Sequence, residues 1–128
     1  MEIHDLWIQN IYWKQKNLTI VKESDPFLRR FGQCDFIQLQ KGEKLEFQRK
    51  KADEVWCVVT GQAVFRLTDL RQDSSSYQAE SILTLDGQSP KTVLVPFGVA
   101  VRIECEMPAI FIRLTTHEDG ENPEDQTP

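Results

Sequence analysis

The sequence predicts a single all-β domain, built as a sandwich or barrel of short strands. From Leu18 to Thr116, stretches rich in Val, Ile, Leu, Phe and Thr are broken by Gly, Pro, Asp or Ser about every eight to twelve residues. No segment of twelve residues holds apolar residues at helical spacing without a breaker. The length of 128 residues fits one domain around one core.

Nine strands are expected, and any helix should be short, near the N-terminus or around Pro26–Phe31. Gly61 and Gly87 fall where tight turns need a positive φ, and prolines lie at strand margins, where a missing N–H does least harm. The expected strands are 18–22, 35–40, 43–50, 54–60, 62–70, 78–85, 91–95, 99–105 and 109–116.

The two ends differ from this central region 18–116. Residues 1–17 form an N-terminal arm whose segment Leu6–Trp13 is too apolar for a free tail, so we expect it to cover a sheet or a partner subunit in a homodimer. Residues 117–128 are acidic, contain two prolines and have no apolar anchor, which predicts a disordered tail.

Composition narrows the possible partners. The net charge of −5 disfavours nucleic acid, and no apolar run reaches the roughly 20 residues of a membrane span. The first residues do not resemble a secretory signal, so a cytoplasmic protein is expected. Cys34, Cys57 and Cys105 lack CxxC spacing, which favours buried free thiols over disulfides or a zinc site.

One segment has the spacing of a known motif. Gly42, Glu54 and Gly61 match the first motif of the cupins, which sets two histidines between the first glycine and the glutamate. Here Gln48 and Lys50 occupy the histidine positions. The segment 96–101 resembles the second cupin motif, with Val101 at its histidine position. The resemblance implies the cupin double-stranded β-helix, or jelly roll.

These substitutions bear on metal binding. Residues two apart on a strand point to one face, so the motif positions converge inside the barrel. Lys is charged at neutral pH and Val offers no lone pair, so one amide and one carboxylate remain as ligands. The only histidines, His4 and His117, lie in terminal segments. We therefore predict no bound metal and no cofactor.

Within the cupins, residues 54–77 resemble the middle of the dTDP-4-dehydrorhamnose 3,5-epimerase family, where a strand ending Asp-Leu-Arg precedes a serine-rich turn. Residues 94–100 and 111–116 are similar to that family's later strands. The resemblance implies metal-independent epimerisation of a 4-keto nucleotide sugar, in which a histidine base removes the proton beside the ketone and a tyrosine acts as the acid.

This sequence departs from the family's catalytic pattern. No histidine occurs between Asp5 and Thr116, and Arg113 holds the position of the tyrosine. Glu54 corresponds to a basic residue of the family. The resemblance therefore supports kinship of fold more than kinship of activity.

The strand directions that both resemblances imply place four polar side chains in the barrel: Gln48, Lys50, Glu54 and Arg113. They could form a pocket with one excess positive charge, suited to a small anion, a sugar phosphate or a carboxylate. They could equally form an internal network that neutralises itself, because an unpaired buried charge is costly.

Three further features allow a functional and a structural interpretation. Trp56 shares a strand face with Glu54 and could stack on a sugar or base, or fill the core. Arg71 could border a nucleotide site, or pair with Asp69 at the surface. Ser74–Ser76 lacks the glycines of a phosphate-binding loop and is interpreted as a plain turn.

The leading functional hypothesis is a metal-independent, epimerase-like cupin that binds a small polar or anionic ligand, such as a sugar nucleotide or sugar phosphate, with catalysis reduced or lost. One alternative is an active epimerase or isomerase with Lys50 or Glu54 as base, since burial can lower the pKa of a lysine. The other is a non-catalytic dimerisation module whose barrel is filled by side chains.

Overall fold

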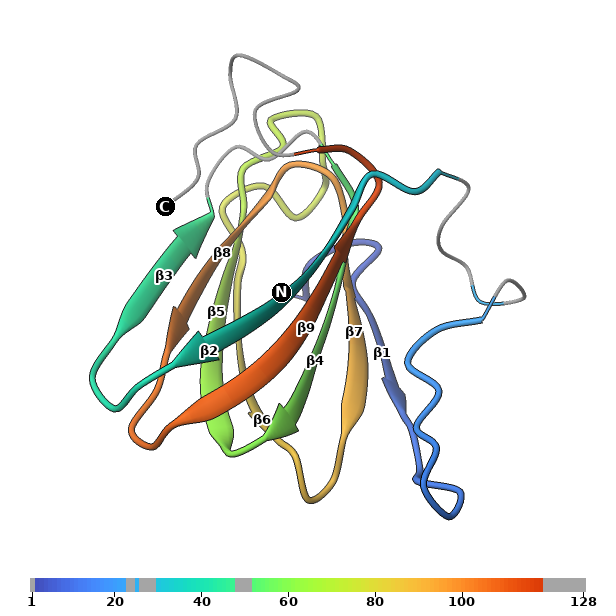
Figure 1. The fold of residues 1–128 in the computed structure, drawn as a ribbon. Helices are drawn as coiled ribbons and strands as arrows, with labels where there is room; N and C mark the ends of the chain where they lie inside the picture. The colour runs from blue at the N-terminus through green and yellow to red at the C-terminus, as the bar shows by residue number, and fades with distance from the viewer. Residues whose placement is uncertain (1, 23–24, 26–29, 48–51, 119–128) are drawn as a thin grey trace.

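The computed structural model describes residues 2–22, 25, 30–47 and 52–118 (Figure 1). Within them the chain forms nine strands and no helix. The strands are β1 (Trp7–Asn10), β2 (Gln33–Leu39), β3 (Lys44–Phe47), β4 (Glu54–Thr60), β5 (Gln62–Asp69), β6 (Glu80–Asp86), β7 (Lys91–Val95), β8 (Val99–Glu104) and β9 (Ala109–Thr115).

Two sheets make up the molecule, and every strand pair within them is antiparallel. One has five strands in the order β1-β7-β4-β9-β2, and the other has four in the order β3-β8-β5-β6. Figure 1 shows the two sheets facing each other, with successive strands passing repeatedly between them. The predicted all-β class is confirmed.

The sequence located eight of the nine strands, and two differences concern the first part of the chain. The strand expected at 18–22 is absent: Ile20 and Val21 pack on the outer face of the five-stranded sheet, against Val55 and Leu94, without pairing as a strand. Conversely, β1 pairs with β7 although it was not expected, because its four residues are too few to show an alternating pattern.

The core between the sheets is aromatic. The rings of Trp56, Phe65 and Phe111 are fully buried, with centroids 5.5 to 6.0 Å apart in tilted or edge-to-face contacts. These residues come from β4, β5 and β9, where alternate residues point inward. The two sheets are therefore held together mainly by these rings and the aliphatic side chains around them.

The two predicted turn glycines are required for different reasons. Gly61 has φ +77°, and a Cβ there would lie 2.1 Å from the carbonyl oxygen of Pro108, so the predicted positive φ is confirmed. Gly87 does not have a positive φ, which corrects the prediction. A Cβ there would lie 2.3 Å from the carbonyl oxygen of Val59, so close approach of the backbone is what excludes a side chain.

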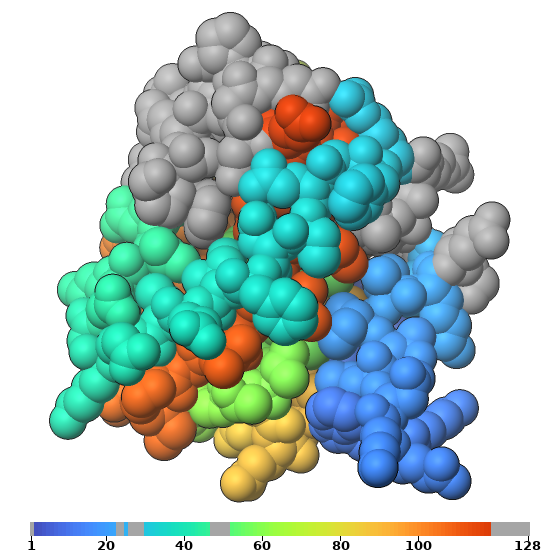
Figure 2. Space-filling model, in the orientation of Figure 1, coloured from blue at the N-terminus to red at the C-terminus, as the bar shows by residue number. Residues whose placement is uncertain are grey.

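The N-terminal segment lies against the five-stranded sheet. Figure 2 shows it in blue as a lobe at one side of the molecule. Leu6 packs on the core and Ile11 is buried, as expected for an apolar segment that covers a sheet. Tyr12 and Trp13 remain exposed to solvent.

The three cysteines are all free thiols, but they differ in exposure. Cys57 and Cys105 are buried, and burial raises the pKa of Cys57 to about 11. Cys34 is exposed on β2, an edge strand, so the prediction that it is buried was wrong. Its side chain points away from the barrel because its neighbour Asp35 points inward.

Candidate functional site

The candidate site lies inside the barrel, where three neighbouring strands of the five-stranded sheet present polar side chains. Arg113 of β9 stands directly opposite Trp56 of β4 on one side and Asp35 of β2 on the other. Glu54 lies two residues before Trp56 on β4 and therefore points to the same face. Register alone thus brings four side chains from separate parts of the sequence together.

These side chains form a charged network. Nε of Arg113 donates to Oε2 of Glu54 at 2.5 Å, and Nη1 donates to Oδ2 of Asp35 at 3.1 Å. The guanidinium carbon lies 5.6 Å from the centroid of the Trp56 ring. Arg113 and Glu54 are each only 1% exposed, whereas the side chain of Asp35 is 31% exposed. The network therefore runs from the core toward solvent through Asp35.

Asp35 is the member of this network that sequence reasoning missed. It changes the charge count, because the described part of the network contains two carboxylates and one guanidinium. The signal was present in the alternation along Gln33–Leu39, where Asp35, Ile37 and Leu39 share one face. A carboxylate on an inward face needs partners, and Arg113 and the side-chain amide of Gln33 both donate to Asp35.

Two predicted site residues, Gln48 and Lys50, lie outside the described residues. Val101, which the resemblance to the second cupin motif aligns with a histidine, is buried in the apolar core. The part of the network that the structure describes therefore rests on Glu54 and Arg113 among the predicted residues, with Asp35 added.

Trp56 is a core residue in this structure. Its side chain is fully buried, and its ring contacts Phe65, Phe111 and the guanidinium of Arg113. Both the predicted proximity to Glu54 and the core interpretation hold. A sugar or base could stack on this ring only after displacing one of these neighbours.

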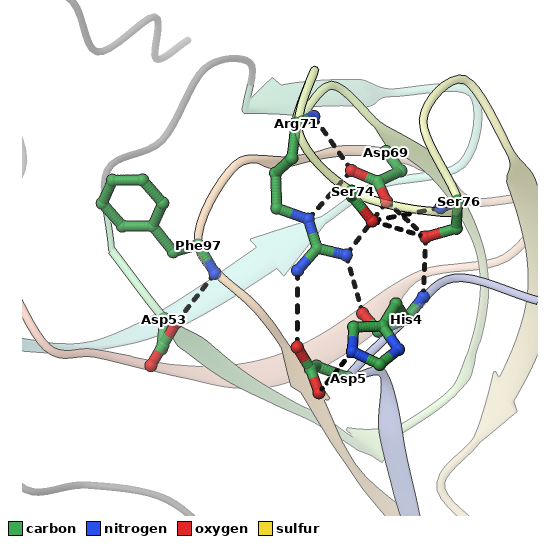
Figure 3. Close-up of polar contacts among 8 residues, drawn as sticks. All are labelled: His4, Asp5, Asp53, Asp69, Arg71, Ser74, Ser76 and Phe97. Atoms are coloured by element: carbon green, nitrogen blue, oxygen red, sulfur yellow. Dashed lines mark hydrogen bonds and ion pairs between the residues drawn. The ribbon is translucent and has the colours of Figure 1, made fainter.

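Arg71 belongs to a separate cluster at the loop after β5 (Figure 3). Its Nε and Nη2 each donate to Asp69 at 2.9 Å, and Nη2 also donates to the backbone oxygen of His4 at 2.7 Å. The hydroxyl of Ser76 donates to Asp69 as well. Arg71 thus joins the N-terminal segment to the β5–β6 loop.

Asp69, the partner of Arg71, is too buried for the two residues to form a surface ion pair. Asp69 is fully buried, and its hydrogen bond from Arg71 holds the pKa of that carboxyl well below its usual range, with a further contribution from Ser76. Ser76 is buried too, and Ser74 bonds to it, so the serine-rich turn organises this carboxylate. The turn interpretation fits these contacts.

The metal content of the protein is a testable prediction. In the described part of the chain, no group of three or more His, Cys, Asp or Glu residues is arranged to hold an ion. We expect purified protein to carry less than about one-tenth equivalent of transition metal, because too few lone pairs converge at the motif positions. Elemental analysis after dialysis checks this; a retained amount near one equivalent would contradict it.

Comparison with known proteins places the fold. A dTDP sugar isomerase from Desulfovibrio desulfuricans G20 superposes with TM-score 0.84 and 14% identity, over 98% of this chain and 85% of the isomerase. A dTDP-6-deoxy-D-glucose-3,5-epimerase from Legionella pneumophila, solved with dTDP-4-keto-L-rhamnose, gives TM-score 0.80 and 21% identity, over 99% of this chain and 74% of the epimerase. The chain has the jelly-roll fold of the dTDP-4-dehydrorhamnose 3,5-epimerases.

One curated protein is also similar to this chain in sequence. The spore coat polysaccharide biosynthesis protein SpsL of Bacillus subtilis is 31% identical over 100 residues, which cover 76% of this chain and 66% of SpsL. The chain thus spans slightly less than two thirds of that relative's length. No family model matches the sequence. The described part of the chain also holds no helix long and apolar enough to cross a bilayer.

Proposed function

We propose that this protein is a metal-independent relative of the dTDP-sugar epimerases that binds a sugar nucleotide or sugar phosphate and has lost the family's proton transfer. The observation that carries the proposal is the match of nearly the whole chain to proteins of this fold that hold dTDP-sugars. The likeness to a polysaccharide biosynthesis protein supports a role in carbohydrate metabolism, which we place in the cytoplasm.

The network around Arg113 argues against the epimerase reaction. The position of the acid is taken by a guanidinium, which does not release its proton in proteins. Glu54 pairs with that guanidinium at 2.5 Å, so its carboxylate is already engaged within the barrel. Of the two proposed bases, Glu54 is therefore poorly placed, and Lys50 is the one to test.

A second function is supported by the filled core. Trp56, Phe65 and Phe111 occupy the space between the sheets, and Arg113 closes onto Trp56. A barrel filled in this way suits an interaction module whose role is to bind another protein or a second copy of itself. The two functions differ in whether any sugar-containing anion stabilises the protein.

Ligand binding is tested by thermal unfolding with dTDP-glucose, UDP-glucose and glucose 1-phosphate. We expect the dTDP-sugar to raise the Tm of the wild type, since a ligand that binds only the folded state stabilises it. The change Lys50→Met should abolish that rise, because it removes the positive charge and keeps the chain length. Lys41→Met, in the exposed turn before β3, is the matched control and should respond as the wild type does.

Catalysis is tested separately by incubating the protein with a dTDP-4-keto sugar in D₂O. We expect no solvent deuterium at the carbons beside the ketone. Incorporation that disappears in Lys50→Met would instead establish an active epimerase with a lysine base. A wild-type protein whose Tm is unchanged by all three ligands would rule out the binding proposal and leave the interaction module.

The predicted homodimer has its own test. Tyr12 and Trp13 are the most exposed large apolar side chains of the N-terminal segment, and β1 is an edge strand that pairs with β7 on one side. We expect Tyr12→Ser with Trp13→Ser to convert a dimer to a monomer in light scattering, because it removes exposed apolar area without removing a strand. Phe97→Ser, at another exposed site, is the control; a double variant that stays dimeric would disprove the assigned role.

A further inference from the structure

The outer face of the four-stranded sheet carries a cavity that is separate from the barrel interior. It has a volume of about 460 Å³, within the roughly 300 to 1,000 Å³ typical of small-molecule sites. Its lining comes from all four strands of this sheet and from Leu70, which follows β5. The side chains that the argument uses are Glu46, Arg66, Glu80, Ile82, Arg102 and Glu104.

Two arginines face each other at its centre. Arg66 of β5 and Arg102 of β8 are directly opposite in the strand register, and their side chains are 46% and 52% exposed. Like charges at directly opposed positions destabilise a sheet pair. Both side chains are half exposed, so their guanidiniums are accessible to a ligand.

The surrounding carboxylates determine what these arginines can bind. Arg102 pairs with Glu46 at 2.8 Å, whereas Arg66 meets Glu104 at 3.8 Å, too far for a hydrogen bond. Glu80 adds a third carboxylate, so the lining residues that the structure describes carry a net charge of −1. This balance disfavours an anion, and the two guanidiniums disfavour a cation.

The shape and the apolar parts of the cavity suit a flat, uncharged molecule. Ala100 and Thr68 are paired beside the two arginines, and their short side chains make a low floor. Ile82, 58% exposed, and Leu70 offer apolar surface on the two sides. A pyranose ring presents C–H groups to such surfaces, and hydroxyls that accept from Arg and donate to Glu.

From these observations we infer that the outer face of the four-stranded sheet is a binding site for a neutral saccharide. The donors of Arg66 and Arg102 and the carboxylates of Glu80 and Glu104 bind its hydroxyls. The site does not depend on the function proposed for the barrel, because its residues point away from the core. A protein with both sites would hold a sugar nucleotide or sugar phosphate in the barrel and an uncharged saccharide on the outer face of the four-stranded sheet.

The test is an NMR titration of the full chain with maltotriose, cellotriose and inorganic phosphate, following the backbone amides of β5 and β8. We expect saturable shifts with at least one trisaccharide and none with phosphate. The variant Arg66→Gln with Arg102→Gln should bind at least tenfold more weakly. The control Lys16→Gln with Lys41→Gln removes the same charge from exposed residues outside the cavity lining and should bind as the wild type does.

Three results would overturn the inference. The first is the absence of saturable shifts with either trisaccharide. The second is a double arginine variant that binds as tightly as the lysine control. The third is displacement of the trisaccharide by dTDP-glucose in direct competition, which would place both ligands in one site. If the double arginine variant does not fold, its amide resonances lose their dispersion. The single variants Arg66→Gln and Arg102→Gln then replace the double variant in the titration.

Discussion

The variant Arg113→Met is expected to lose about 3–5 kcal/mol of unfolding free energy, the usual cost of breaking a buried ion pair by removing one partner. Glu54 is 1% exposed and would lose the guanidinium that pairs with it, and Asp35 would lose the same partner. Met also lacks the guanidinium that lies over the Trp56 ring, so the loss includes this contact. Urea unfolding at neutral pH measures it.

Two further variants identify the cause of that loss. Adding Glu54→Gln to Arg113→Met should recover part of the stability, because the buried carboxylate that paired with the guanidinium is removed as well, and the two positions should show coupling in a double-mutant cycle. Arg66→Met, which removes a half-exposed guanidinium, should change stability by no more than about 0.5 kcal/mol. Equal losses in Arg113→Met and Arg66→Met would show that the buried network does not stabilise the fold.

The variant Asp69→Asn is expected to lose roughly 2–3 kcal/mol at pH 7, from hydrogen bonds that a charged acceptor makes stronger. Asp69 accepts from the side chain and backbone nitrogen of Arg71 and from the hydroxyl of Ser76 while fully buried (Figure 3). An amide can accept fewer of these bonds and places its NH₂ against a donor. The β5–β6 loop and the attachment of His4 should both loosen.

The pH dependence of this loss follows from the lowered pKa of Asp69. In the unfolded chain the carboxyl of an aspartate has a pKa of about 3.9. In the folded protein the hydrogen bond from Arg71 holds the pKa of Asp69 below that value. Its contribution is therefore complete above about pH 4 and is lost as the pH falls further. The stability gap between wild type and Asp69→Asn should be constant from pH 7 to 5 and should narrow at more acidic pH. Asp73→Asn, in the same loop and exposed, should show no gap at any pH.

Much of the fold could be predicted because its signals are local. Alternating apolar residues and the glycine and proline positions located eight strands, including 91–95 to the residue. The strand expected at 18–22 shows the limit of this signal, because Ile20 and Val21 contact the apolar outer face of a sheet without pairing. Two neighbouring apolar residues give the same sequence pattern whether they lie within a strand or pack against a sheet.

The candidate site divides in the same way. The sequence by itself determined that Glu54 and Trp56 share a face and that no histidine lies between Asp5 and Thr116. Each of these depends on residue identity and on spacing of two along a strand, which the chain carries locally.

Only the tertiary structure decided which charges neutralise one another. Asp35 reaches Arg113 because β2 pairs with β9 in a register that joins residues 78 apart, and Arg66 faces Arg102 because β5 pairs with β8. Strand register over such separations is set by packing of the whole barrel, and a shift of one residue would turn each of these side chains to the opposite face. Charge neutralisation in the barrel and the paired arginines outside it therefore follow from the fold, while the residues that take part follow from the sequence.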